Sequence, residues 1–287
     1  MPNLPNGLCM LPGGVLAIAS CEAHSRSTVK FVAARNDSDP QALAACQASS
    51  LAARRFEWLM GLAHTNDGLL ACSLGDSSAA LYKFALDGSM DELATVRALA
   101  DYGQGFTRCV VHQQTQRTYA LGDDEEGRCA VAILDANLQV IATVEDTGGV
   151  PEDFDDVDED WCPIRDVAVH GDQVVVLTTD HHSKGSGLRL LDLDGRFLRT
   201  VAAGQFHNPW VVTVSHGRAF VIDELAKLSI LGKALYIIDI QSGDILQITH
   251  LELHGSVSAI LVDGDEIFIS GYTASTVVVL RFAGSEA

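Results

Sequence analysis

The chain has 287 residues, 47% of them hydrophobic but only 6% aromatic, so aliphatic side chains must fill most of a sizeable core. Acidic residues outnumber basic ones by 38 to 19, and the resulting net charge of −19 repels phosphate backbones. We therefore expect no nucleic-acid partner, and we expect no membrane insertion because no apolar stretch is long enough to span a bilayer.

The predicted elements begin with an apolar stretch at 8–20, which Pro12-Gly13-Gly14 interrupts and which no Lys or Arg precedes. This pattern predicts strands joined by a turn rather than a secretion signal. An insert follows at 36–57, where an Ala-, Gln-, Leu- and Arg-rich segment after Pro40 predicts helical or irregular structure. Groups of four short strands are then expected at 62–96, 107–144, 164–201 and 210–248, and three strands at 257–282.

The clearest group lies at 164–201, where an alternating strand, a Gly171 turn, a second strand, a polar loop and a third strand precede the hairpin signal Asp194-Gly195. The turns of this group recur along the chain at intervals of roughly 40 to 58 residues, a period typical of propeller blades. The sequence therefore predicts an all-β fold, a single β-propeller of about six four-stranded blades over residues 1–287. A β-sandwich is the alternative, although it requires no such repeat.

The stretch Val174–Asp223 resembles NHL repeats. Its matching parts are Asp180 at the end of a strand, a Leu-Asp-x-Asp-Gly hairpin ending at Gly195, and a Gly-x-Phe-x-x-Pro link ending at Pro209. The Asn-His-Arg that NHL repeats carry in the polar loop is replaced by His181-His182-Ser183. The resemblance implies a propeller whose relatives include ubiquitin-ligase substrate modules, RNA-binding propellers, an amidating lyase and lactonases, so it does not select a function.

An aspartate closes or follows the second strand in four successive predicted blades. We expect these carboxylates at one face of the central channel, where they could bind a divalent cation such as calcium with help from a histidine. The alternative is that each aspartate caps its loop by accepting backbone N–H bonds. The candidate metal ligands are Asp76, Asp123, Asp180, Asp223 and His182.

Two arginines, Arg108 and Arg165, occupy corresponding places near the start of two predicted inner strands. From there they could bind an anionic ligand in the channel. The alternative is that they pair with local acids such as Asp166.

The segment 145–162 is rich in acidic residues and contains no base. It lies between the third and fourth predicted blades, on the face that carries the second-to-third-strand loops. It predicts a surface for a basic protein partner, and the alternative is a solvated loop. The candidate partner-binding residues are Glu152, Asp153, Asp155, Asp156, Asp158 and Asp160.

The sequence lacks a nucleophile elbow and a phosphate-binding loop, so it identifies no catalytic residue and leaves enzymatic activity open. It favours a non-catalytic binding or scaffold module, monomeric, recognising a protein partner through an acidic top face. The alternative is a metal-dependent hydrolase or lyase of small molecules, with a cation at the channel mouth. No cofactor is required by the first hypothesis.

Seven cysteines without a CxxC pair predict free thiols and hence a cytoplasmic setting. The ring is expected to close by packing of the sixth blade against the first. Residues 1–6 should contribute little, because their two prolines remove strand hydrogen-bond donors.

Overall fold

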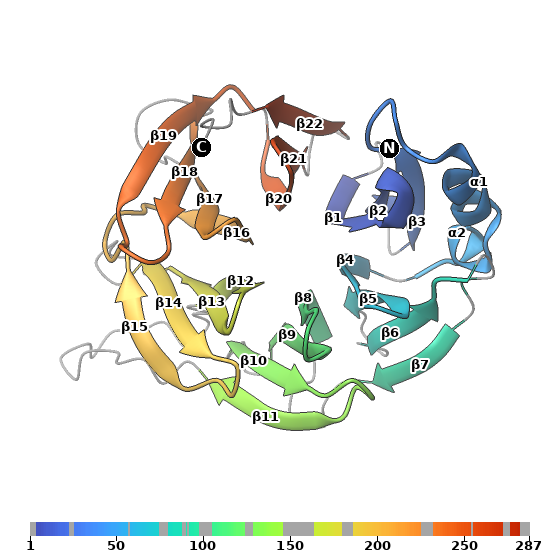
Figure 1. Cartoon of the computed structure of the whole chain (residues 1–287), viewed down its shortest axis with the longest axis horizontal. Helices are drawn as coiled ribbons and strands as arrows, with labels where there is room; N and C mark the ends of the chain where they lie inside the picture. Colours follow the sequence, from blue (N-terminus) through green and yellow to red (C-terminus); the bar gives the residue numbers. More distant parts are fainter. Residues whose placement is uncertain are drawn as a thin grey trace.

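The chain forms a closed ring of six antiparallel blades around a central channel, the second and third of which are joined into one sheet by a bridge between Leu74 and Gly105 (Figure 1). The structure is a computed structural model, and it describes residues 4–22, 26–56, 58–74, 80–87, 90, 92–97, 105–123, 129–145, 164–179, 186–224, 232–253, 255–271 and 276–281. The expected all-β class and single six-bladed propeller are confirmed.

Blades 2 to 5 each contain four strands, ordered from the channel outwards. They are β4 (Trp58–His64), β5 (Gly68–Leu74), β6 (Ala80–Ala85) and β7 (Glu92–Arg97); β8 (Gly105–His112), β9 (Arg117–Asp123), β10 (Cys129–Leu134) and β11 (Val140–Glu145); β12 (Ile164–His170), β13 (Gln173–Thr178), β14 (Gly187–Asp192) and β15 (Phe197–Val201); and β16 (Pro209–Ser215), β17 (Arg218–Glu224), β18 (Lys233–Asp239) and β19 (Ile245–Leu251).

The first and last blades have three strands each among the described residues, as expected for the last blade from its sequence. Blade 1 consists of β1 (Leu4–Leu11), β2 (Val15–Glu22) and β3 (Arg26–Ala33), with the short 3-10 turn Pro12–Gly14 between β1 and β2. Blade 6 consists of β20 (Val257–Asp263), β21 (Glu266–Gly271) and β22 (Thr276–Arg281).

The Asp-x-Asp-Gly hairpin of blade 4 explains why its outer strands turn where they do. The Asp192 Oδ1 atom accepts hydrogen bonds from the N–H groups of Asp194 and Arg196, at 2.9 and 2.8 Å. Gly195 has a φ of +86°, which L side chains rarely adopt. Asp135 caps the corresponding turn of blade 3 through the N–H groups of Asn137 and Gln139.

The core lies between the blades, where aliphatic side chains of neighbouring sheets pack together. An aromatic pair recurs in two of these layers. The ring of Phe56, just before β4, meets Tyr82 of β6 edge-on, and Phe206, just before β16, meets Tyr236 of β18 in the same way; both centroid distances are 5.4 Å. The two pairs occupy equivalent places in blades 2 and 5.

Two short helices, α1 (Pro40–Ala48) and α2 (Ser50–Ala53), lie within the 36–57 stretch and pack on the outer side of β3. The Asp39 carboxylate caps α1 by accepting the Gln41 N–H at 2.8 Å. Leu51 of α2 is buried in the core of blades 1 and 2. The outermost strand of blade 1 is therefore covered.

The ring closes through packing and ion pairs, without a strand shared between its ends in the described part of the chain. Leu8 and Leu16 of blade 1 pack against Phe268 of blade 6. The Arg35 guanidinium, just after β3, binds the carboxylates of Glu266 at 2.7 Å and Asp263 at 2.8 Å. The expectation of closure by packing is thus met.

The expectation that residues 1–6 contribute little to ring closure stays a prediction, because the described ladder shows only the place of residues 4–6 within blade 1. Leu4 and Pro5 pair with Cys21 and Ser20 in the β1–β2 ladder, so they belong to the inner strand of blade 1. Pro5 is tolerated because this ladder lies at the channel, where β1 has no second hydrogen-bonded neighbour among the described strands.

The cysteines do not all behave as expected. Cys9, Cys21, Cys46, Cys72 and Cys109 are free thiols, whereas Cys129 is disulfide-bonded. Cys162 lies outside the described residues. The disulfide removes the argument from free thiols to a reducing compartment. None of the described helices is long and apolar enough to cross a membrane.

Candidate functional site

The inner strands of all six blades carry a β-bulge at the same place. In each inner ladder the register shifts by one residue about two residues after the strand begins. We call the six extra residues the bulge ring; in blade order they are Asn6, Met60, Thr107, Arg165, Trp210 and Ser258.

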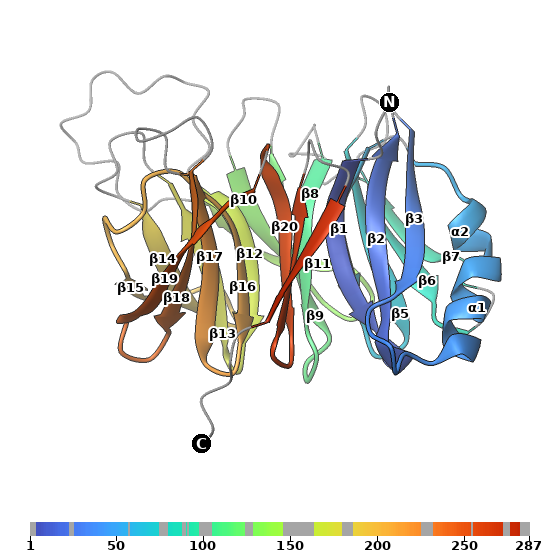
Figure 2. The ribbon, with the colours of Figure 1, turned by 90° about the horizontal axis from the view of Figure 1, so that it is seen from above.

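The bulge ring lies near the top face, which we define as the face where each inner strand begins and each second strand ends (Figure 2). Bulges turn side chains and carbonyl groups away from the regular ladder, and they are frequent beside functional sites. The ring therefore marks the level of the channel at which polar groups from all blades can meet.

Arg108, directly after the bulge of blade 3, spans the channel at this level. Its guanidinium donates hydrogen bonds to the carbonyl oxygens of three bulge residues, Met60 at 3.1 Å, Thr107 at 3.0 Å and Ser258. Since β8 and β20 lie on opposite sides of the ring (Figure 1), the side chain connects facing blades.

Asp166 is the partner of Arg108. Its carboxylate lies 3.5 Å from the Arg108 Nε atom and also accepts the Val167 N–H at 2.9 Å and the Val212 N–H at 2.8 Å. Together Arg108 and Asp166 contact blades 2, 3, 4, 5 and 6. Asn6 adds blade 1 through a bond from its Nδ2 atom to the Leu59 carbonyl at 3.4 Å.

The two arginines expected at corresponding places are offset by one residue. Arg165 is itself the bulge residue of its strand, whereas Arg108 follows the bulge and corresponds to Asp166. The Arg165 guanidinium lies over the Trp210 ring at 5.2 Å, a cation–π contact that joins blades 4 and 5. Arg108 pairs with Asp166, which is the alternative to ligand binding for this arginine.

Asp223 is the one candidate metal ligand whose side chain the structure describes. It is fully buried, and its two oxygens accept the N–H groups of His207 at 3.0 Å and Asn208 at 2.6 Å. Burial raises its pKa, while these two bonds lower it. Asp223 therefore caps the link into β16, as the alternative interpretation states.

The other candidate ligands are not brought together by the described residues. Asp123 ends β9 at the top face, but its side chain is not described, and Asp76, Asp180 and His182 lie outside the described residues. Within the described ranges no three His, Cys, Asp or Glu side chains group as a metal site.

The six candidate partner-binding acids, from Glu152 to Asp160, also lie outside the described residues. The strands that flank them are described: β11 ends at Glu145 and β12 begins at Ile164, both at the top face. The acidic segment therefore leaves and rejoins the propeller at the face where the bulge ring lies.

Sequence reasoning missed two polar atoms of the bulge ring, Asn6 Oδ1 and Trp210 Nε1, which are buried without a hydrogen-bond partner in the described structure. A bound water or a polar ligand group would satisfy them. Consecutive polar residues at the start of an inner strand, as in Thr107-Arg108 and Arg165-Asp166, are the sequence signal that could have revealed the bulges.

The ring of blades and its bridged channel define the protein as a six-bladed β-propeller. Among solved structures it is similar to hydrazine synthase of Kuenenia stuttgartiensis, with 12% identity over 97% of this chain and 96% of that chain and a TM-score of 0.59. It is also similar to a gluconolactonase of Xanthomonas campestris, with 13% identity over 98% of this chain and 86% of that chain and a TM-score of 0.57. A third similar structure is BamB of Moraxella catarrhalis, with 11% identity over 97% of this chain and 85% of that chain and a TM-score of 0.52.

Identities this low show the fold alone, and these propellers differ in function. No protein family model matches the chain, and no curated protein matches it in sequence. The finer resemblance to NHL repeats is therefore not confirmed.

The buried Asp166 predicts an unusual pH dependence of stability. Burial raises its pKa from 3.8 to about 6, against the opposing effect of Arg108 and two backbone N–H groups. Because the folded pKa lies above the unfolded one, the contribution to stability is complete below pH 4. This contribution is lost as the pH rises through 6, which lowers the free energy of unfolding by up to about 3 kcal/mol.

Urea unfolding of the wild type and Asp166→Asn between pH 4 and 7 measures this effect. The difference in free energy of unfolding, wild type minus variant, should fall as the pH rises. Asp172→Asn, at an exposed turn of the same blade, should give a constant difference. A constant difference for Asp166→Asn would contradict the prediction.

Proposed function

We propose that this propeller is a non-catalytic binding or scaffold module, which recognises a basic protein partner through its acidic top face. The observation that carries the proposal is the use made of the polar channel residues. Arg108, Asp166 and Asp223 are each bound to groups of another strand or link, so they hold the ring together. We therefore expect the loops of the top face, and not these channel residues, to bind the partner protein.

The acidic charge of the chain also favours the top face as the surface that binds the partner. The chain carries a net charge of −19, and the acidic segment 145–162 joins blades 3 and 4 at the top face. Acidic patches attract basic partners over distances of about a Debye length and raise the association rate more than the final affinity. The proposed complex is therefore sensitive to salt, and the chain enters it as a monomer.

Removing three charges from this segment tests the proposal. Asp155, Asp156 and Asp158 are replaced by Asn in one variant. In a control, three exposed acids at turns of the opposite face, Asp172, Asp244 and Asp265, are replaced in the same way. Proteins captured from a lysate by each variant are compared by quantitative mass spectrometry at low and physiological salt.

Basic partners should be lost from the loop variant and retained by the control, and raising the salt should release them from the wild type. If the loop variant captures the same proteins as the wild type, the acidic segment is not the binding surface. Catalysis at a bound cation, the alternative function, predicts instead a stoichiometric metal in elemental analysis of protein purified without chelator.

A further inference from the structure

Blade 6 lacks a fourth strand among the described residues, so its third strand, β22, forms the outer edge of the blade. Blades 2 to 5 each have a fourth strand outside the third, and the third strand of blade 1 is covered by α1 and α2. No described strand pairs with the outer edge of β22, whose residue Val279 is 48% exposed. Such an edge presents N–H and C=O groups to an added strand.

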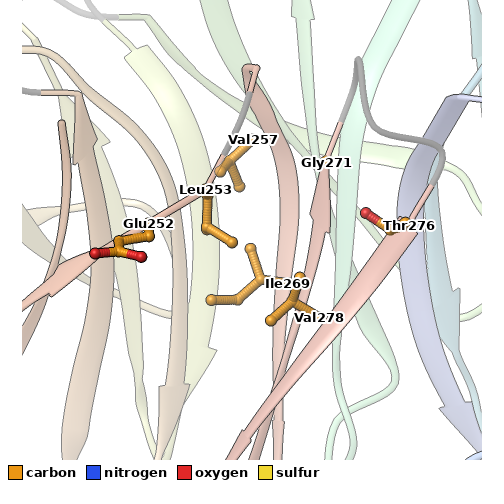
Figure 3. A pocket seen from close by; sticks show the side chains of 7 residues that line it. All are labelled: Glu252, Leu253, Val257, Ile269, Gly271, Thr276 and Val278. Carbon is orange, nitrogen blue, oxygen red and sulfur yellow. The ribbon is translucent and has the colours of Figure 1, made fainter. Parts of the chain in front are cut away.

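A pocket opens beside this edge, between β22 and the link from β19 to β20 (Figure 3). The pocket has a volume of about 140 Å³ and is open to solvent. Its wall is apolar, formed by the side chains of Leu253, Val257, Ile269 and Val278, while Glu252 and Thr276 lie at its margins.

The register of the blades explains why the pocket is empty here. Val278 of β22 corresponds to Tyr236 of β18 and to Tyr82 of β6, counted from the equivalent inner bulges. In blades 2 and 5 that tyrosine meets a phenylalanine of the preceding link and fills the space. Val278 is smaller than tyrosine and lines the pocket, whose apolar side chains suit an aromatic ring.

We propose that blade 6 binds an extended peptide of a partner protein, which adds to β22 as a fourth strand and inserts an aromatic side chain into this pocket. A residue paired with Val278 points its side chain to the same face as Val278, toward the pocket. A lysine or arginine near the aromatic residue lies close to Glu252, which is exposed at the margin of the pocket.

The negative charge of the chain favours a basic peptide over a second copy of the chain as the binding partner of β22. Two copies would each carry a net charge of −19, and their mutual repulsion opposes pairing of one β22 with another. A basic peptide is attracted by the same field. The site lies on blade 6, whereas the strands that flank the acidic segment, β11 and β12, belong to blades 3 and 4, so separate variants test the two.

The test uses a short fluorescent peptide that alternates threonine and lysine around one central tyrosine, with binding followed by anisotropy. Val278→Tyr rebuilds the aromatic filling of blades 2 and 5 and should weaken binding by about tenfold or more while the fold is kept. Val279→Tyr, the same change on the next residue, faces the other side of the strand and should leave binding unchanged. Glu252→Lys should also weaken it, whereas Asp244→Lys on blade 5 should not.

Two further measurements separate strand addition from simple pocket or charge binding. Peptides N-methylated at alternate residues in the two opposite registers should differ, because only one of them keeps the N–H groups that face β22. Hydrogen exchange at Thr276–Arg281 should slow when the unmodified peptide binds.

Equal binding of both methylated peptides, or equal binding by Val278→Tyr and wild type, would overturn the proposal. The variant with Asp155, Asp156 and Asp158 replaced by Asn should bind the peptide as the wild type does. If it loses the peptide, the binding belongs to the acidic segment and not to blade 6.

Discussion

Replacing Arg108 by Met should lower the free energy of unfolding by about 3 to 5 kcal/mol, the usual cost of leaving one member of a buried ion pair without its partner. The Arg108 side chain is 19% exposed and that of Asp166 is 7% exposed, so water can replace little of what is lost. The bulge carbonyls of Met60 and Ser258 would lose their donor as well. Methionine keeps much of the aliphatic length, so the effect reports the charge and its hydrogen bonds.

Urea unfolding at pH 7 measures the change, with Arg196→Met as the matched control. Arg196 is exposed in the turn between β14 and β15, and its replacement should cost less than about 0.5 kcal/mol. The double variant with Arg108→Met and Asp166→Asn should lose less free energy of unfolding than the sum of the two single losses. The second change removes the Asp166 charge that Arg108→Met leaves buried without a partner. Strictly additive losses would show that the two residues do not act as a pair.

The repeat and its turns were predictable from the sequence because they are local. A hairpin such as Asp192 to Gly195 carries its own capping carboxylate and its own glycine, so its residues identify it wherever they occur. The spacing of such turns was sufficient to predict a six-bladed ring. The three strands of blade 6 were also expected, whereas the three-stranded blade 1, whose outer strand is covered by helices, was not.

The site was less predictable because it depends on register and on contacts between distant blades. Arg165 is the bulge residue of its strand and Arg108 follows the bulge of its own, although both stand near the start of an inner strand in the sequence. No local sequence pattern indicates that Arg108 pairs with Asp166, or that its guanidinium donates to the carbonyl of Ser258. The empty pocket of blade 6 likewise becomes visible only when Val278 is aligned with Tyr236 through the ladders.

Replacing Gly61 by Ala should also destabilise the protein strongly, because two inner strands approach closely at this residue. A Cβ atom at Gly61 would lie 2.6 Å from the Cys72 Sγ atom and 3.3 Å from the Arg108 Cα atom. On the neighbouring strand, a Cβ atom at Gly7 would lie 2.9 Å from the Gly61 Cα atom. The added methyl group must therefore displace β4, β5 or β8, at a cost of about 1 to 3 kcal/mol.

Cys72→Ala provides the control, since it removes the sulfur atom that the new methyl group would meet. The double variant Gly61→Ala with Cys72→Ala should recover part of the loss, with a coupling energy of about 0.5 kcal/mol or more. Recovery should remain incomplete, because the backbone of β8 still lies within 3.4 Å of the new atom, at the Cys109 nitrogen. An alanine at Gly61 that leaves the urea midpoint unchanged would show that β1, β4 and β8 are not held at this spacing, and that the bulge ring tolerates a wider channel.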